Sequence, residues 1–251
     1  MVKIIMHGCN GAMGQTVTSI AAKDGEARIV AGIDITGEQK NDYPVYKTLE
    51  ECREEADVII DFASAKAVDH LLDYSADRQI PVVLCTTGLS EEQVKKVGEA
   101  AKKTAILRSA NMSLGVNLLL KLVKEAAKTL AAAGFDIEIV EKHHNQKVDA
   151  PSGTALALAD SINEAMENAY YYKYDRASQR AKRDPKEIGI QSVRGGSIVG
   201  DHDVIFAGQD EVVTFSHTAY SKAIFAKGAV SAAKFLKGKE PGLYNMSDVI
   251  G

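Results

Sequence analysis

Short β-branched runs alternate with segments of helical periodicity along the first 110 residues, and this alternation constrains the fold more than any other feature of the chain. It is typical of βαβ units, in which helices cover both faces of a parallel sheet. We therefore expect these residues to form a Rossmann-type domain. The predicted strands are Val2–Met6, Arg28–Ile33, Asp57–Asp61, Pro81–Cys85 and Ala105–Leu107, and the predicted helices are Ala12–Asp24, Lys66–Arg78 and Glu91–Lys103.

The pattern changes beyond residue 110. We expect an α/β fold: a Rossmann-type parallel-sheet domain made of residues 1–110 and 223–251, with residues 111–222 inserted as an α+β domain. The insert is predicted to contain helices at Gly115–Ala133 and Thr154 to about Ala169, a strand at Asp136–Lys142, and strands expected to be antiparallel at Ile188–Val193, Asp203–Ala207 and Val212–His217. Ala223–Leu236 returns to helical periodicity.

Composition and charge exclude several classes of protein. With 45% hydrophobic residues, the chain of 251 residues is long enough for two modest domains. Its formal charge of -4 argues against binding along nucleic acid, which depends on neutralising phosphates. No apolar run has the length of a signal peptide or a membrane span, so we expect a cytoplasmic protein without nucleic-acid or membrane partners.

The three cysteines, Cys9, Cys52 and Cys85, are widely spaced and form no CxxC pattern. They indicate neither a disulfide framework nor a thiolate metal site, and a reducing compartment fits them. Cys85 has no His or basic neighbour in the sequence that would lower its pKa. We therefore expect it to be a small packing residue and not a nucleophile.

The segment Gly8-Cys9-Asn10-Gly11-Ala12-Met13-Gly14 links a predicted strand to a predicted helix. Glycines at such a turn let the backbone approach a pyrophosphate, and the helix N-terminus attracts its negative charge. Asp34 ends the next strand, where a carboxylate would hydrogen-bond the ribose of a dinucleotide. The spacing is GxxGxxG and not GxGxxG, and the alternative is a turn that serves only the packing of helix on strand.

Two later segments, Cys85-Thr86-Thr87-Gly88 and Ser109-Ala110-Asn111-Met112-Ser113, follow predicted parallel strands. Ligands of such sheets bind beyond the carboxyl ends of the strands. Small and hydroxyl-bearing side chains there would admit a nicotinamide ring and hydrogen-bond its amide. Thr-Thr-Gly taken alone is more typical of a simple turn.

The densest group of reactive side chains lies in residues 141–155, E-K-H-H-N-Q-K-V-D-A-P-S-G-T-A. His143 and His144 stand at the end of a predicted strand, where adjacent side chains can point in different directions, and Lys147 adds a positive charge. The N–H and hydroxyl groups of residues 152–154 precede a helix and favour a carboxylate, so a dianionic substrate would fit. One alternative is a metal site, for which a third ligand is missing; another is a pair of solvent-facing histidines beside a capped helix.

This segment is similar to the signature segment of the 4-hydroxy-tetrahydrodipicolinate reductases, also called dihydrodipicolinate reductases. The resemblance covers essentially the whole chain and includes, in order, G-C-N-G-A-M-G, V-I-I-D-F, T-T-G, A-N-M-S-L-G-V-N, S-V-R-G-G-S-I-V-G-D-H, S-H-T-A-Y-S-K and F-A-K-G-A-V. The combination of His-His-x-x-Lys with Pro-Ser-Gly-Thr is highly specific, whereas the glycine turn is not.

The resemblance implies an NADH- or NADPH-dependent oxidoreductase of the diaminopimelate route to L-lysine, active as a homotetramer assembled through the inserted sheet. It implies His143 and Lys147 as catalytic residues and no metal. The substrate dicarboxylate would be bound by His144, Ser152, Gly153 and Thr154. The cofactor would be bound by Gly8, Cys9, Asn10, Gly11, Ala12, Met13, Asp34, Cys85, Thr86, Thr87, Ser109, Ala110, Asn111 and Met112.

Three positions depart from the family pattern. Cys85 stands where many relatives have glycine, and Lys222 stands where arginine is common, so a bidentate carboxylate contact would be lost. Ile35 follows Asp34 where members that favour NADPH often have arginine. Asp34 would repel a 2′-phosphate unless a cation such as Lys40 compensates, so we expect NADH preference or the use of both cofactors.

Two other functions stay open at the level of sequence. A reductase of the same architecture would act on another imine, as amino-acid dehydrogenases do. A nucleotide sensor would need a partner or a DNA-binding module, and the chain shows no helix-turn-helix with a basic face. The basic residues between Lys173 and Lys186 would form an anion-binding patch or, as we prefer, a solvated surface.

Overall fold

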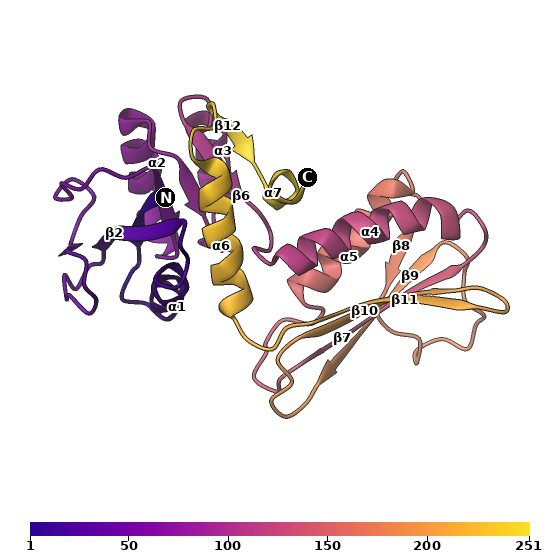
Figure 1. Ribbon diagram of the computed structural model, residues 1–251. Helices are drawn as coiled ribbons and strands as arrows, with labels where there is room; N and C mark the ends of the chain where they lie inside the picture. Colours follow the sequence, from indigo (N-terminus) through magenta and orange to yellow (C-terminus); the bar gives the residue numbers. More distant parts are fainter. The chain divides into compact units, whose positions relative to one another are not determined.

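A seven-stranded parallel sheet lies at the centre of the first of two units in the computed structural model, which describes residues 1–251 (Figure 1). This unit comprises Met1–Ser113 and Lys222–Gly251. Its strands, in spatial order, are β12 (Gly242–Tyr244), β6 (Ala105–Arg108), β5 (Val82–Leu84), β4 (Val58–Asp61), β1 (Val2–His7), β2 (Ala27–Ile33) and β3 (Val45–Tyr46). The strand order reverses at β1, which lies between β2 and β4.

Burial on both faces explains why helices cover this sheet. All residues of β4 and β5 are buried, and strands of this kind need apolar cover on each side. The helices of the unit are α1 (Ala12–Ala21), α2 (Ala65–Arg78), α3 (Glu91–Ala100), α6 (Ala223–Leu236) and α7 (Met246–Ile250).

Helix α6 approaches the segment after β6 closely because it contains a glycine. A Cβ atom at Gly228 would lie 1.7 Å from the carbonyl oxygen of Met112, a distance that no side chain tolerates. The last part of the chain therefore fixes the segment around Met112, which belongs to the predicted cofactor residues.

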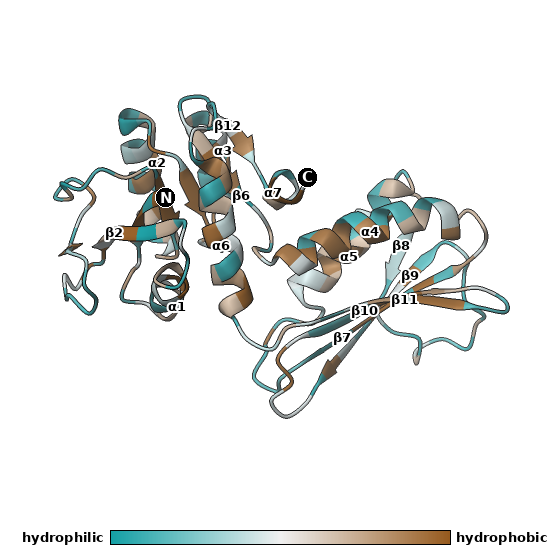
Figure 2. Cartoon of the chain, in the orientation of Figure 1, coloured by the Kyte–Doolittle hydropathy of each residue, from teal (hydrophilic) through white to brown (hydrophobic).

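The second unit, Leu114–Ser221, is a five-stranded sheet with order β11-β10-β7-β9-β8 and two helices. Its elements are α4 (Leu114–Leu130), β7 (Asp136–His143), α5 (Gly153–Ala165), β8 (Tyr171–Lys173), β9 (Glu187–Arg194), β10 (Asp201–Ala207) and β11 (Val212–Thr218). Burial alternates along β7, and its buried face packs with α4 and α5 into one apolar cluster. Figure 2 shows hydrophobic and hydrophilic stretches side by side along these two helices, as expected where one face is buried.

The predicted α/β fold class is confirmed, but one predicted strand direction is wrong. β10 pairs antiparallel with β7 and β11, as expected. β9 is instead parallel to β7 and β8, so Ile188–Val193 is not an antiparallel strand. The connection from β7 to β9 includes α5, which provides the crossover that a parallel pair needs, and side-chain alternation is the same in both directions.

Four short elements, β3, β8, β12 and α7, are not predicted from the sequence. Unlike β4 and β5, which are also short, the strands among them have no run of buried apolar residues. β8 lies in the polar stretch that precedes Ile188. None of the helices combines the length and the apolar content that a membrane span requires.

Candidate active site

The loops after β1, β2, β5 and β6 lie at one edge of the first sheet, because the strands run in the same direction. The reversal of strand order at β1 is the position at which open parallel sheets bind their ligands. The structure thus brings the predicted cofactor residues to a common edge: Gly8, Cys9, Asn10, Gly11, Ala12, Met13, Asp34, Cys85, Thr86, Thr87, Ser109, Ala110, Asn111 and Met112.

The glycine turn after β1 is sterically restricted to glycine at two positions. Gly8 has a φ of +80°, and a Cβ atom there would lie 2.8 Å from the carbonyl oxygen of Phe62. A Cβ atom at Gly14 would lie 2.3 Å from the carbonyl oxygen of Gly8. Gly11 begins α1, and no side chain caps its first turn. The first N–H groups of α1 are therefore not used by a capping side chain, as a phosphate site requires.

Asp34 directly follows β2 and is held by the glycine turn. Its carboxylate accepts hydrogen bonds from the Asn10 N–H at 3.1 Å and from the Thr36 hydroxyl at 2.9 Å. Partial burial alone would raise the pKa of Asp34, but the hydrogen bonds from Thr36 and Asn10 lower it below its ordinary value. An ionised carboxylate therefore stands next to the turn, where it would accept hydrogen bonds from ribose hydroxyls.

The two cysteines at this edge are not activated. Burial raises the pKa of the Cys9 thiol to about 11, and burial together with Asp61 raises the pKa of the Cys85 thiol well above its ordinary value. Both thiols are therefore protonated near neutral pH, which agrees with the expected packing role of Cys85. The hydroxyl of Thr86, next to Cys85, is buried without a hydrogen-bond partner. A polar group of a bound ligand would satisfy this hydroxyl.

A buried pair, His7 and Asp61, lies at the same edge. His7 Nδ1 is 2.8 Å from Asp61 Oδ1, and the second carboxylate oxygen of Asp61 is buried without a hydrogen-bond partner. Neither residue is among those predicted from the sequence to bind a ligand. The only sequence signal is the position of each at the end of a strand, directly before a loop at the ligand-binding edge.

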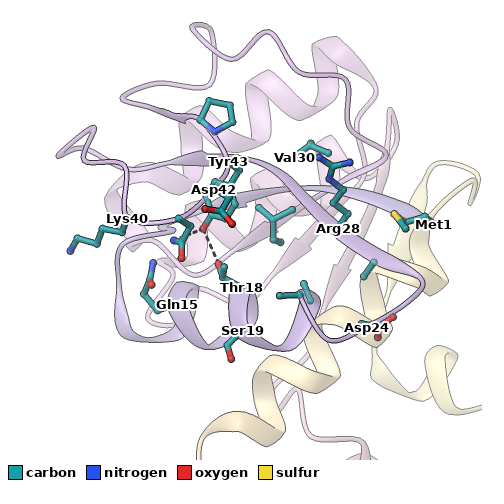
Figure 3. Close-up of a pocket in the computed structure, with 16 residues that line it drawn as sticks. Met1, Gln15, Thr18, Ser19, Asp24, Arg28, Val30, Lys40, Asp42 and Tyr43 are labelled. Carbon is teal, nitrogen blue, oxygen red and sulfur yellow. Dashed lines mark hydrogen bonds between the residues drawn. The ribbon is translucent and has the colours of Figure 1, made fainter.

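One cavity of the first unit does not coincide with this edge. It has a volume of about 680 Å³ and lies between α1, β2 and residues 40–44 (Figure 3). The Thr18 hydroxyl and the Tyr43 hydroxyl, 2.8 Å apart, form part of its wall. Neither the glycine turn nor Asp34 lines this cavity, so the predicted cofactor residues of these motifs lie outside it.

In the second unit, Glu141 and His143 lie two residues apart on the buried face of β7. His143 Nδ1 is 2.6 Å from Glu141 Oε2, and Arg194 at the end of β9 binds the same carboxylate through both terminal nitrogens at 2.7 Å. Burial alone would raise the pKa of Glu141, but hydrogen bonds, first from Arg194, lower it to about 2. Glu141 is therefore ionised throughout the physiological range.

Ser152 and His202 extend this cluster towards α5. The Ser152 hydroxyl accepts a hydrogen bond from the Ala155 N–H at 3.1 Å, which caps α5, and lies 2.8 Å from His202 Nε2. Burial, reinforced by the nearby His143, lowers the pKa of His202 to about 4. His202 is therefore neutral near pH 7. The Ser152 hydroxyl, predicted to contact substrate, is itself buried and hydrogen-bonded within the protein.

The other predicted substrate residues lie around the start of α5. Lys147 Nζ is 2.7 Å from Asp149 Oδ1, so its ammonium group has a carboxylate neighbour in the protein. His144 is half-buried directly after β7, and Gly153 and Thr154 form the first turn of α5, with space around Gly153. The structure thus brings His143, the loop of Lys147 and the N-terminus of α5 together within one unit.

Glu141, Arg194 and His202 were missed as individual site residues in the sequence analysis. The sequence could have indicated Glu141, because a strand places residues two apart on the same face and His143 was already a candidate. For Arg194 and His202, the sequence offers only their place in segments that resemble the family. Only the pairing of β9 and β10 with β7 brings them beside Glu141.

The basic segment at residues 173–186 is bound to the sheet. Arg183 Nη1 lies 2.8 Å from Asp136 Oδ1, and Arg176 contacts Glu138 and Glu187. The expectation of a solvated surface is therefore wrong for these two arginines, which ion pairs hold against β7 and β9. No group of three or more His, Cys, Asp and Glu side chains is arranged to hold a metal ion.

Two family models match consecutive parts of the chain. The model described as "Dihydrodipicolinate reductase, N-terminus" matches residues 2–112, and "Dihydrodipicolinate reductase, C-terminus" matches residues 115–250. The chain belongs to the dihydrodipicolinate reductase family. The family expected from the sequence, and its class as an oxidoreductase, are therefore confirmed.

Curated relatives match this family member over its full length. A 4-hydroxy-tetrahydrodipicolinate reductase of Caldanaerobacter subterraneus subsp. tengcongensis is 56% identical over 254 residues, which cover 100% of this chain and 98% of the relative. The protein of the same name from Clostridium tetani is 47% identical over 246 residues, 98% of this chain and 96% of the relative.

Solved structures resemble the fold of this dihydrodipicolinate reductase family member. A dipicolinate-bound dihydrodipicolinate reductase from Paenisporosarcina sp. TG-14 has a TM-score of 0.84 at 24% identity and covers 100% of both chains. An amine dehydrogenase from Mycobacterium smegmatis has a TM-score of 0.65 at 12% identity and covers 98% of this chain and 95% of its own. At these identities the likeness concerns the fold alone.

The depressed pKa of His202 predicts a pH dependence of stability. The unfolded chain binds a proton near pH 6.5 that the folded chain accepts only near pH 4, so stability is complete above pH 6.5 and falls as the pH drops to 4. The loss is on the order of 3 kcal/mol. Urea unfolding at several pH values should show this slope in wild type and a reduced slope in His202→Gln.

His70→Gln provides the control, because the His70 side chain is 56% exposed and lies in the other unit. This variant should keep the wild-type slope. Equal slopes in wild type and His202→Gln would contradict the assignment of a buried, neutral His202.

Proposed function

We propose that the chain reduces 4-hydroxy-tetrahydrodipicolinate to tetrahydrodipicolinate in the diaminopimelate route to L-lysine. The observation that carries this proposal is the cluster of His143, Lys147 and the first turn of α5 in a chain that matches the family from end to end. The substrate is a dicarboxylate, and the cluster offers imidazole, ammonium and helix N–H groups.

The first unit would bind NADH or NADPH, which supplies a hydride to the substrate. The fit rests on the uncapped first turn of α1, the steric need for Gly8 and Gly14, and the unpartnered hydroxyl of Thr86. The diphosphate would lie against Gly8–Met13, and Asp34 would accept hydrogen bonds from the adenosine ribose. Residues 85–87 and 109–112 follow β5 and β6 and would line the nicotinamide side.

The second unit would bind the substrate and supply the proton. The carboxylates would be held by His144, Lys147 and the first-turn groups of Gly153 and Thr154, with Ser152 shaping that turn as its cap. Protonated His143 would deliver a proton from Nε2 as negative charge develops on the ring. Lys147 would stabilise the same charge, provided that the substrate replaces Asp149 as its neighbour.

We further propose a homotetramer in the cytoplasm, with the second sheet as the contact between copies. The face of this sheet opposite to α4 and α5 is open: Val193 and Val212 are 45% and 62% exposed, and exposed residues alternate with half-buried ones along β11. The three cysteines form no disulfide, which fits a reducing compartment. Light scattering gives the number of copies, and a monomer at micromolar concentration would contradict the assembly.

The proposed reaction predicts oxidation of NADH or NADPH when the product of dihydrodipicolinate synthase is supplied. His143→Gln and Lys147→Ala should each lower kcat by on the order of a hundredfold, because each removes a group that acts on the developing charge. Absorbance of the reduced nicotinamide measures the rate. Lys124→Ala is the matched control, since Lys124 is also paired with a carboxylate, Glu164 at 2.9 Å, but on the helices.

Absence of oxidation with both cofactors, in folded protein that binds NADH, would contradict the proposed substrate. Wild-type rates in both His143→Gln and Lys147→Ala would contradict the proposed site while leaving the reaction intact.

Ionised Asp34 predicts a higher kcat/KM with NADH than with NADPH, because the carboxylate repels a 2′-phosphate. Ile35 is 90% exposed, so Ile35→Arg should fold normally and place a cation beside that phosphate. We expect kcat/KM for NADPH to rise by on the order of tenfold, with little change for NADH.

Val94→Arg is the control, because Val94 is 40% exposed on α3 and adds the same charge elsewhere on the unit. An equal rise in Val94→Arg, or none in Ile35→Arg, would show that Ile35 does not face the cofactor ribose.

A further inference from the structure

The Glu141 carboxylate is fully buried, yet hydrogen-bond donors of Arg194, Ser192, His143 and Ser152 surround its two oxygens. Oε1 accepts from Arg194 Nη2 at 2.7 Å and from the Ser152 N–H at 3.0 Å. Oε2 accepts from Arg194 Nη1 at 2.7 Å and lies 2.6 Å from His143 Nδ1. Charge-assisted bonds of this number keep a buried carboxylate ionised.

An ionised carboxylate accepts hydrogen bonds but donates none, so the proton between Glu141 and His143 belongs to Nδ1 of the ring. Neutral His143 is then the Nδ1–H tautomer, with its lone pair on Nε2. When the ring is protonated, Glu141 retains the Nδ1 proton, and the proton available for transfer is on Nε2.

Gly200 lies on the Nε2 side of the ring, where any larger residue would approach Nε2. A Cβ atom at Gly200 would lie 3.2 Å from His143 Nε2, closer than most side chains approach. The other titratable and charged groups of the cluster are Arg194 from β9, His202 from β10, His217 from β11, and Lys147 and Asp149 from the loop after β7, with Asp201 of β10 near His217. Among these carboxylates, Glu141 is the one within hydrogen-bond distance of the His143 ring.

Arg194 also links the Glu141 carboxylate to the loop after β7 that bears Lys147. Its Nη2 also donates to the Asp149 carbonyl oxygen at 2.7 Å, in the loop that bears Lys147. The Ser152 N–H on Glu141 Oε1 places the residue that caps α5. One carboxylate–guanidinium pair thus joins the end of β7, the loop of Lys147 and the start of α5.

We propose that Glu141, held by Arg194, is a positioning residue that fixes His143 as the Nδ1–H tautomer and so makes Nε2 the atom that faces the substrate. The inference rests on the proposed function for the identity of that substrate. The tautomer itself is a property of the ligand-free protein and is measured without any reaction.

Glu141→Gln is an informative substitution because its amide has only one acceptor oxygen. An amide oxygen at the Oε1 position satisfies both Arg194 Nη2 and the Ser152 N–H, and it places the NH₂ group near His143 Nδ1 with a single unfavourable contact, to the donor Arg194 Nη1. The opposite orientation would set the NH₂ group against two donors, Arg194 Nη2 and the Ser152 N–H. The first orientation makes Nδ1 an acceptor, so the substitution should convert neutral His143 to the Nε2–H tautomer.

The test is the set of ¹⁵N chemical shifts of the ring in the ligand-free protein, assigned by the loss of signals in His143→Gln. Wild type should show Nδ1 protonated and Nε2 unprotonated above the pKa of the ring, and Glu141→Gln should show the reverse. An Nε2–H tautomer in wild type would overturn the proposal, even if Glu141→Gln fails to fold.

The pH profile of kcat distinguishes a positioning role of Glu141 from a merely structural one. Glu141→Gln removes the anion that favours the imidazolium, so the activity should be lost at a lower pH than in wild type as the pH rises. We expect kcat to fall by on the order of a hundredfold. Arg194→Lys keeps a cation beside Glu141 but loses the two-bond contact, so it should preserve the Nδ1–H tautomer and lower kcat less than Glu141→Gln does.

Glu50→Gln is the matched control, because Glu50 Oε1 lies 2.7 Å from His70 Nε2 in an exposed pair of the other unit. It should leave activity, pH profile and the His143 signals unchanged. An unshifted pH profile and tautomer in Glu141→Gln would overturn the proposal. Inactive wild type with the expected tautomer would instead refute the proposed function alone.

Discussion

Burial of the Glu141 carboxylate is unfavourable unless donors satisfy it, and the functional end of the second unit is built from those donors. Arg194 comes from β9, the imidazole from β7 itself, and the Ser152 N–H from the start of α5. Removing Arg194 would leave the buried charge of Glu141 without the guanidinium that is paired with it. The requirement to satisfy this carboxylate therefore aligns three elements, and the same alignment sets the proposed proton donor beside the proposed carboxylate site.

In the first unit, the ligand-binding edge is built by backbone segments that pack closely against each other, and not around a buried charge. Gly8 and Gly14 allow the turn after β1 to pack against the backbone of its neighbours, and Gly228 allows α6 to reach the segment after β6. The order of the strands then collects the loops at one edge. Asp34, ionised and tied to Asn10, gives this edge the feature that would distinguish NADH from NADPH.

Sequence periodicity predicts the fold class and most long elements, because buried strands and amphipathic helices repeat at different periods. It does not predict the direction of β9, since alternation is the same in parallel and antiparallel strands. Segments that resemble the family predict His143 and Lys147 as site residues. The side chains that surround His143 are placed there by the pairing of the strands, which the sequence does not reveal. Arg194 and His202 lie 51 and 59 positions beyond His143 in the sequence, and only the sheet brings them to Glu141.

The central claim is that Glu141 acts on the reaction through His143. A double-mutant cycle in kcat tests it most directly, with wild type, Glu141→Gln, His143→Gln and the double variant. The account predicts strong coupling: Glu141→Gln should cost on the order of a hundredfold in wild type and less than about threefold when His143 is already absent. The same factor in both backgrounds would contradict the account and make Glu141 a structural residue with no link to proton transfer.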